Sequence, residues 1–435
     1  MTACAIETAA EVRAVASTGF TITADGTYGA RLAGTGDALF PERWTLDGPE
    51  PYAVPLPLDH PEERDAEVQP LTDGRVLISR RAGERYGFSL LYPTGPGTGE
   101  LAVGAVTAEK LTLLPPSPDG AHVYALTPGR TSTGIWLVAG GASGPEHIAE
   151  VPGHCSGGVW LDRAGRMLAL DHRQPGGPVK TVAVDLARGG EVSPLLQITE
   201  DSDDRLLLAD ADSGLLLIRS NATGADQDRL GWGVLGSLRP VRFPRSLRLP
   251  DALVTPFAVQ PGQVLTPEAC AVALRIDGAA GSWVGVWRPA GRRVHQLAPP
   301  RGWLAGSGTW SRDGVLHLPY ATREVPCGVA HAEAPTDTPA DRGAADRGAA
   351  DRGGSARGGS AKGAAAGGGS AQGRRAETFG LADAKTARSP DGGPATEPAQ
   401  VERAGGQPCE ASGSPVVCQP VPLQQAPLSG RAAAG

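Results

Sequence analysis

The densest group of acidic side chains in the sequence lies between residues 200 and 212. Besides Glu200 it contains five aspartates, Asp201, Asp203, Asp204, Asp210 and Asp212. Asp210-x-Asp212-x-Gly214 has the spacing that opens a calcium loop, in which alternate carboxylates surround a hard cation and a glycine permits the bend. However, the bidentate glutamate that usually completes such a loop is missing, and Leu215 to Ile218 read as a strand. A hairpin turn is therefore the favoured interpretation. We predict no metal and no cofactor, and expect Asp201 to Asp204 in a solvated loop or at the mouth of a channel.

The other residues with metal-ligating or nucleophilic chemistry are scattered. Eight histidines and six cysteines occur singly along the chain, without a C-x-x-C pair. One combination with permissible spacing would join Cys155 and His154 to Cys327 and His331, because strand residues four apart face the same side. Buried thiols that act as small apolar side chains are the favoured alternative. In the cytoplasm, where we expect the protein, the cysteines would stay reduced.

The motifs that mark common enzyme classes are missing from the sequence. It contains no G-x-S-x-G nucleophile elbow, no Walker loop, no H-E-x-x-H and no dinucleotide-binding glycine pattern after a strand. A peptidase that combines a propeller with a hydrolase domain would also need a longer chain. We therefore name no catalytic residue from the sequence.

The elements that position these side chains follow from a turn that recurs at a nearly constant interval. Seven turn dipeptides are separated by Gly-to-Gly steps of 48, 46, 45, 49, 48 and 52 residues: Asp25-Gly26, Asp73-Gly74, Asp119-Gly120, Ala164-Gly165, Ser213-Gly214, Pro261-Gly262 and Asp313-Gly314. Each turn except that at Gly262 leads at once into a short apolar or alternating strand. Because Asp-Gly favours tight hairpin turns and the period is near 48 residues, the sequence predicts a propeller of similar units.

A second landmark supports the repeat. About twenty residues after each of the first six turns a second strand is expected, anchored in order at Trp44, Leu90, Trp136, Val184, Trp232 and Val286. Four-stranded blades need such hairpins and large side chains between blades, so Trp44, Trp136, Trp232 and Trp287 are predicted to pack there. The unit at Gly262 is irregular, because Pro267 interrupts it and the next strand, Ala271 to Ile276, comes late. We predict an all-β propeller of seven blades over residues 18–332, with six blades as the alternative.

The segment PSPDGAHVYAL, Pro116 to Leu126, with the Trp136 strand behind it, resembles a blade of the broad WD40-like or TolB-like propeller superfamily. The stretches LYPTGPGTGE, GGVWLDRAGR and VPLQQAPL make the chain similar to propeller-like proteins of actinobacteria, over about residues 1 to 330 and the last twenty. This resemblance implies the propeller fold and brings no activity with it.

Both ends of the chain differ from the repeats. Residues 1–17 are predicted to form a short helix, since Glu7 and Glu11 do not suit a signal peptide. Residues 333–414 contain tandem ADRGA repeats and a Gly/Ser/Ala tract with almost nothing apolar to bury, so we predict a disordered insertion. Residues 415–435, with Val416, Val417 and Leu423, are predicted to return as a closing strand and tail that completes the last blade.

Charge and hydropathy limit the partners that we expect. The chain has 40 Lys and Arg against 47 Asp and Glu, a net charge of −7, which disfavours nucleic acid. No stretch is long and apolar enough for a membrane helix. The first function hypothesis is a non-catalytic scaffold, a monomer that binds a partner protein not identifiable from sequence. The alternative is a propeller enzyme or small-molecule binder, like propeller hydrolases and lactonases, with its site in the central channel.

Overall fold

The computed structural model describes residues 19–335, except 223, 225–227 and 263–265. Its contacts divide the chain into two compact units, residues 1–337 with 420–435 and residues 338–419, and every described residue belongs to the first. The predicted N-terminal helix, almost all of the predicted insertion and the predicted closing strand lie outside the described residues. Among those described, no helix is long and apolar enough to cross a bilayer.

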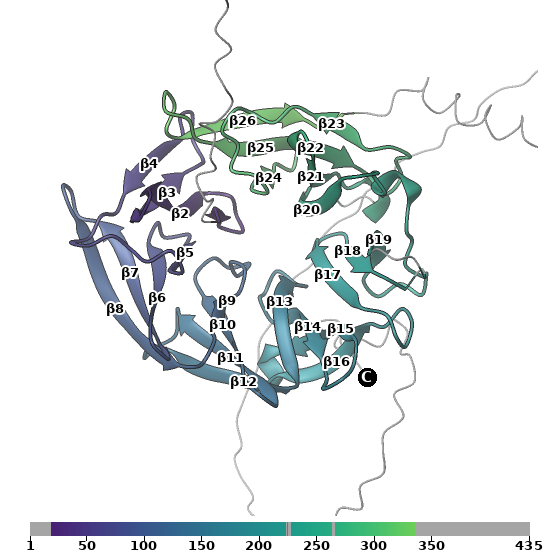
Figure 1. The fold of residues 1–435 in the computed structure, drawn as a ribbon, viewed down its shortest axis with the longest axis horizontal. Coiled ribbons are helices and arrows are strands. Elements are labelled where there is room, and N and C mark those ends of the chain that lie inside the picture. Colours follow the sequence, from purple (N-terminus) through teal and green to yellow (C-terminus); the bar gives the residue numbers. More distant parts are fainter. Residues whose placement is uncertain (1–18, 223, 225–227, 263–265, 336–435) are drawn as a thin grey trace, which may run out of the picture. The chain divides into compact units, whose positions relative to one another are not determined.

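Seven antiparallel sheets form a ring around a central channel (Figure 1). Each sheet is one blade, and each is built from strands that are consecutive in sequence. The first four blades have four strands each: β1(Thr21–Ile22), β2(Tyr28–Thr35), β3(Ala38–Thr45), β4(Tyr52–Pro55); β5(Glu67–Pro70), β6(Val76–Ala82), β7(Arg85–Pro93), β8(Thr98–Thr107); β9(Thr112–Leu113), β10(Val123–Pro128), β11(Ser132–Ala139), β12(Glu146–Pro152); β13(His154–Trp160), β14(Met167–Arg173), β15(Val179–Asp185), β16(Glu191–Leu196).

The last three blades are less uniform. Blades 5 and 7 have three strands in the described part of the chain, and blade 6 has four: β17(Asp204–Ala209), β18(Leu215–Ser220), β19(Arg229–Val234); β20(Leu253–Val259), β21(Val272–Gly278), β22(Gly281–Trp287), β23(His295–Leu297); β24(Thr309–Trp310), β25(Val315–Tyr320), β26(Gly328–Glu333). The 3-10 helices are η1(Leu186–Arg188), η2(Arg245–Leu247) and η3(Pro267–Ala269). The prediction of seven blades is confirmed, and the alternative of six is wrong.

Each recurring turn joins the first strand of its blade to the second. The glycines of all seven turns have φ between 65° and 83°, a conformation that side chains with a Cβ rarely adopt. In blade 3 the Ser117 hydroxyl donates to the Asp119 carboxylate at 2.7 Å, and that carboxylate accepts the backbone N–H of Ala121 at 2.9 Å. Thr23 and Asp25 repeat the first bond in blade 1, at 2.6 Å. Local hydrogen bonding therefore fixes the turn in the same way in separate blades.

The six anchors of the second landmark all lie in the third strands of their blades. Trp44 and Trp287 are fully buried, Trp232 is buried, and Trp136 is partly buried. The Trp136 indole donates to the Thr127 hydroxyl at 3.0 Å, and the Trp44 ring meets Phe20 edge-on at 5.0 Å. These contacts confirm that the tryptophans pack in the core. The irregular unit is also confirmed, because η3 intervenes before β21 in blade 6.

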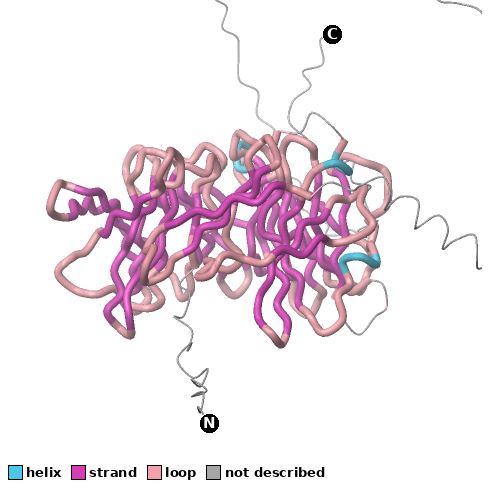
Figure 2. The backbone as a smooth tube through the Cα atoms, turned by 90° about the horizontal axis from the view of Figure 1, so that it is seen from above, coloured by secondary structure: helices cyan, strands magenta, loops and turns pink. Residues whose placement is uncertain are grey.

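Buried apolar clusters join consecutive blades from blade 1 to blade 7. At the seam where blade 7 returns to blade 1, the Ser307 hydroxyl donates to the backbone oxygen of Phe20 at 3.0 Å. Figure 2 shows that the strands cross the thickness of the ring while loops gather on its two faces. The result is a scaffold that presents the inner strands to the channel and the loops to solvent.

Candidate functional site

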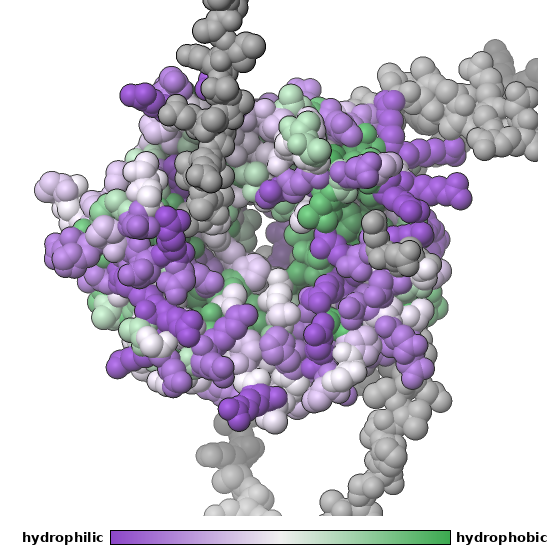
Figure 3. All heavy atoms as spheres, in the orientation of Figure 1, coloured by the Kyte–Doolittle hydropathy of each residue, from purple (hydrophilic) through white to green (hydrophobic). Residues whose placement is uncertain are grey.

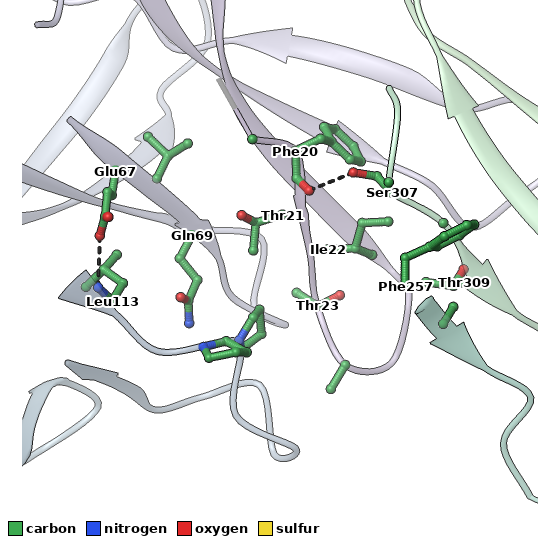
Figure 4. Close-up of a pocket in the computed structure, with 18 of the residues that line it drawn as sticks. Phe20, Thr21, Ile22, Thr23, Glu67, Gln69, Leu113, Phe257, Ser307 and Thr309 are labelled. Atoms are coloured by element: carbon green, nitrogen blue, oxygen red, sulfur yellow. Dashed lines mark hydrogen bonds between the residues drawn. The ribbon is translucent and has the colours of Figure 1, made fainter. Parts of the chain in front are cut away.

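A cavity with a volume of about 900 Å³ lies in the channel. Its walls come from the inner strands of five blades, β1, β5, β9, β20 and β24, and from the residues beside them. In Figure 4, Glu67 and Gln69 lie on one side of the cavity and Phe257 and Thr309 on the other, with Thr21 between them. Inner strands from distant parts of the sequence thus meet around one space.

One position recurs in this lining. The residue four places before the first residue of each turn dipeptide faces the cavity in five of the seven blades, namely Thr21, Gln69, Pro115, Phe257 and Thr309. Because strand side chains alternate between faces, a constant offset from a fixed turn selects a constant orientation. The offset becomes visible once the structure shows where the inner strands lie, because β1, β9 and β24 have only two residues each.

Gln69 is the most constrained polar side chain of the cavity wall. The residue is only 3% exposed, and its amide makes no side-chain hydrogen bond to the residues that the structure describes. The amide is not among the fully enclosed unpartnered groups of the described chain, so it still reaches the space of the channel. A carboxamide has both donors and an acceptor, and can therefore bind a group that enters the channel.

Glu67 is the half-buried carboxylate of the cavity. It accepts the backbone N–H of Leu113 at 2.9 Å, across the boundary between blades 2 and 3 (Figure 4). Burial raises the pKa of Glu67 above its ordinary value, and the bond from Leu113 offsets only part of that effect. Glu67 also lines a second cavity, of about 610 Å³, with Arg81, Lys110 and His154. It therefore lies between the channel cavity and a second pocket that has more charged side chains in its lining.

Besides Arg64 and Asp65 at its edge, the remaining polar side chains of the cavity wall are hydroxyls. Ser307 is the serine of the cavity wall, and its hydroxyl donates to the backbone oxygen of Phe20. The Thr23 hydroxyl donates to Asp25, so it belongs to the turn. Thr21 and Thr309 lie at the recurring position that faces the space. This wall suits hydrogen bonding to a neutral polar ligand that also has apolar parts, which Phe20, Ile22 and Phe257 would contact.

The structure places the aspartates that the sequence singled out away from this cavity. Asp204 is fully buried between blades 4 and 5, where it accepts from the Lys180 ammonium at 2.9 Å and from the Ser220 hydroxyl at 2.6 Å. The Asp203 carboxylate accepts the backbone N–H of Val179 at 2.6 Å, and Asp201 is exposed. Asp203 and Asp204 thus connect strands of neighbouring blades.

Asp210 and Asp212, at the turn of blade 5, make different kinds of contact: Asp210 bonds within the turn, and Asp212 bonds to the neighbouring blades. Asp210 accepts from the hydroxyl of Ser213 at 2.6 Å and from its backbone N–H at 2.9 Å, inside the hairpin. Asp212 forms a two-pronged ion pair with Arg163 of blade 4 and accepts the backbone N–H of Gly262 of blade 6 at 2.7 Å. In the described part of the chain, no group of three or more His, Cys, Asp and Glu has metal-binding geometry.

The combination of Cys155 and His154 with Cys327 and His331 is wrong. The first pair lies in β13 of blade 4, whereas Cys327 and His331 belong to blade 7, three blades further round the ring. His331 instead lies opposite His317 across the β25–β26 pair, with ring centroids 4.6 Å apart. Equal spacing within strands could not reveal which blades are neighbours.

No protein-family model matches the sequence, and no curated protein matches it. Solved structures similar to the chain include TolB from Acinetobacter baumannii, 12% identical over 70% of this chain and 79% of that one, with a TM-score of 0.39. Prolyl oligopeptidase B from Galerina marginata is 14% identical over 73% of this chain, with a TM-score of 0.45. Hydrazine synthase from Kuenenia stuttgartiensis is 12% identical over 77% of this chain and 100% of that one, with a TM-score of 0.46.

This chain spans about half of the peptidase, 49% of its length. The propeller assignment rests on the seven sheets themselves, and the activities of these proteins are not transferred to this one.

Proposed function

We propose that the protein is a non-catalytic interaction module that binds an extended segment of a partner protein in its channel. The observation that carries this proposal is the Gln69 amide, which lines the channel and has no hydrogen-bond partner among the described residues. A peptide group offers the donor and the acceptor that a carboxamide needs. An extended segment presents such groups at regular intervals along its length.

The rest of the cavity supports the same class of ligand. Its walls combine the Thr21 and Thr309 hydroxyls with the rings of Phe20 and Phe257, so they suit a chain that is polar in its backbone and apolar in its side chains. The Glu67 carboxylate would receive a lysine side chain or an amino terminus of that segment. The volume of about 900 Å³ is within the usual range for ligand sites.

The alternative of a hydrolase or lactonase-like enzyme would require a nucleophile next to a general base. The channel serine, Ser307, donates its hydroxyl in a hydrogen bond to the backbone oxygen of Phe20 instead. Glu67 forms its hydrogen bond with the Leu113 N–H and makes none with Ser307. These contacts favour binding over bond cleavage.

The proposal can be tested by site-specific photo-crosslinking of the full chain in its native cells. Benzoylphenylalanine is placed at Ile22 or Thr309 in the channel, or at Tyr52, which is 52% exposed on β4. We expect a light-dependent adduct with one protein from the channel positions, reduced when Gln69→Leu is added. An adduct with the mass of a small molecule, or no channel adduct, would contradict the proposal.

A further inference from the structure

A third cavity, of about 790 Å³, opens between blades 5 and 6. One wall comes from Arg219 in β18 and from residues 228–230 at the start of β19, and the others are residues 243–249 and the beginning of β20. Figure 3 shows hydrophobic surface beside the channel near β20, with hydrophilic side chains around it. This groove shares no lining residue with the channel cavity.

The groove has an aliphatic floor. Leu230, Leu247 and Val254 are 8%, 4% and 6% exposed and belong to the buried cluster that joins the two blades. Leu253, at the start of β20, is 59% exposed. A large exposed leucine next to a buried aliphatic floor indicates a surface that apolar side chains of a binding partner could cover.

The rim of the groove is cationic. Among the residues that the structure describes, four arginines line it, Arg219, Arg229, Arg245 and Arg248, against one acidic residue, Asp228. Arg219 already donates to the backbone oxygen of Val254 at 3.3 Å. The Arg229 Nε atom is buried and has no hydrogen-bond partner. The side chains of Arg245 and Arg248 make no ion pair or hydrogen bond with the residues that the structure describes. Unpaired guanidinium groups around a pocket are the usual means of binding carboxylates.

The local sequence explains why these cations gather here. Residues 239–248 read RPVRFPRSLR, with an arginine at every third position. Blade 5 lacks a fourth strand among the described residues, and this segment follows β19 in its place. Arg242 lies over the Trp232 ring at 5.1 Å and Trp232 pairs with Arg242 through the backbone, which fixes the segment against β19.

From this geometry we infer a second binding site, which takes an acidic, extended peptide of a partner protein with aliphatic anchor residues. The carboxylates of that peptide pair with Arg229, Arg245 and Arg248, and its aliphatic side chains cover Leu253 and the floor. The excess of guanidinium groups supplies charge complementarity for a short acidic segment. A nucleic acid fits less well, because the floor is mainly aliphatic rather than a stack of aromatic rings and the whole chain carries a net charge of −7.

The site can be tested with fluorescein-labelled peptides and fluorescence polarisation on the full chain. The probe is a peptide of about ten residues in which Glu alternates with Leu; the comparison probes replace Glu by Gln or are oligouridine of similar length. We expect the Glu peptide to bind and the Gln peptide to bind at least about tenfold more weakly. Raising the salt from about 50 to about 300 mM should weaken binding, because the rim contacts are partly exposed.

Variants assign the binding to the groove. Arg245→Glu with Arg248→Glu should weaken the Glu peptide at least about tenfold, and Leu253→Ser should weaken it several-fold without a change of charge. The matched control is Arg85→Glu with Arg323→Glu, two exposed arginines at hairpins of blades 2 and 7, which should stay within about twofold. Gln69→Leu should bind the probe as the wild type does, which separates this site from the channel.

Three results would overturn the inference: no binding of the Glu peptide, equal binding by the Arg245→Glu/Arg248→Glu variant, or tighter binding of the oligouridine. A melting curve of each variant confirms that it is folded before binding is measured.

Discussion

The ammonium group of Lys180 donates to the Asp204 carboxylate across 2.9 Å and so joins β15 of blade 4 to the first strand of blade 5. Asp204 is fully buried. Its carboxylate also accepts hydrogen bonds from the Ser202 and Ser220 hydroxyls and from the Ile198 backbone N–H. The acidic cluster that looked most functional in the sequence thus contains a structural joint. Buried charges are tolerated where every lone pair has a donor, and here each carboxylate oxygen has at least two.

Removing this joint should cost much of the stability of the ring. We expect Asp204→Ala to lower the free energy of unfolding by about 3 to 5 kcal/mol, because it leaves the Lys180 charge without its carboxylate. Urea denaturation followed by tryptophan fluorescence measures the change. Asp201→Ala, three residues away and exposed, is the matched control and should stay within about 0.5 kcal/mol. Equal effects of the two changes would show that the buried pair is not a joint.

Asp212 should make the ring sensitive to acid. The Arg163 guanidinium, followed by the Gly262 N–H, holds the pKa of Asp212 below its ordinary value. Its stabilising effect is therefore complete above the pKa of an unfolded aspartate, about 3.9, and is lost as the pH falls through the lower folded pKa. Asp212→Asn should be less stable than the wild type by at most about 1 kcal/mol near neutral pH, since Arg163 is largely exposed.

Denaturation at a series of pH values checks this sign. The difference between Asp212→Asn and the wild type should shrink below about pH 4. A difference that grows as the solution becomes more acidic would contradict the assignment.

Gln69 gives a test that separates binding from folding. Replacing it by leucine, which has a similar size, removes an amide that lines the channel and has no hydrogen-bond partner in the described chain, so stability should be nearly unchanged. A structural amide would instead cost about 1 to 3 kcal/mol when removed. Thermal unfolding of the ligand-free protein measures the difference, and a marked loss of stability would mean that Gln69 serves the fold.

The cysteines of the blades should be chemically inert. Burial raises the pKa of the Cys155 thiol to about 11 and that of Cys327 to about 12, and also raises the pKa of Cys270. At about pH 8, no more than about one Cys155 thiol in a thousand is a thiolate. Brief treatment with iodoacetamide followed by peptide mass spectrometry should find these three unmodified in the native protein and modified in guanidinium chloride. Fast native labelling of any of them would show that its blade opens.

That residues 415–435 form a closing strand remains a prediction. The arrangement of blade 7 indicates where such a strand would pair. This blade has three strands in the described chain, with β26 at its edge, so a fourth position beside β26 is open to a further strand. If residues 415–435 fill it, deleting Pro415 to Gly435 should clearly lower the melting temperature. An unchanged melting curve would assign that segment no part in the fold.

The architecture could be predicted because its signals are local. A dipeptide such as Asp73-Gly74 sets a hairpin through its own backbone preferences, and a Trp such as Trp44 marks a buried third strand wherever the tertiary structure places it. Neither signal depends on distant parts of the chain. Seven repetitions then determine the ring.

The binding surfaces could not be predicted in the same way. The inner strands β1, β9 and β24 have two residues each, too few for alternation to show which side chain faces the channel. The acidic cluster at residues 200–212 drew attention as a candidate functional site, because composition does not reveal that Lys180, 24 residues earlier, forms an ion pair with Asp204. The arginines of residues 239–248 were visible as a pattern, but their groove exists only once blades 5 and 6 pack together.

The hydrogen bond between Ser307 and Phe20 spans 287 residues of sequence. At the usual rates of translation, roughly 5 to 20 residues per second, a ribosome takes about 15 to 60 s to make the stretch between them. Throughout that interval the newly made first blade has no seventh blade to meet, and its flank is open to other nascent chains. The ring therefore cannot close during most of its synthesis. Protection of the first blade by chaperones matters most before the last blade has left the ribosome.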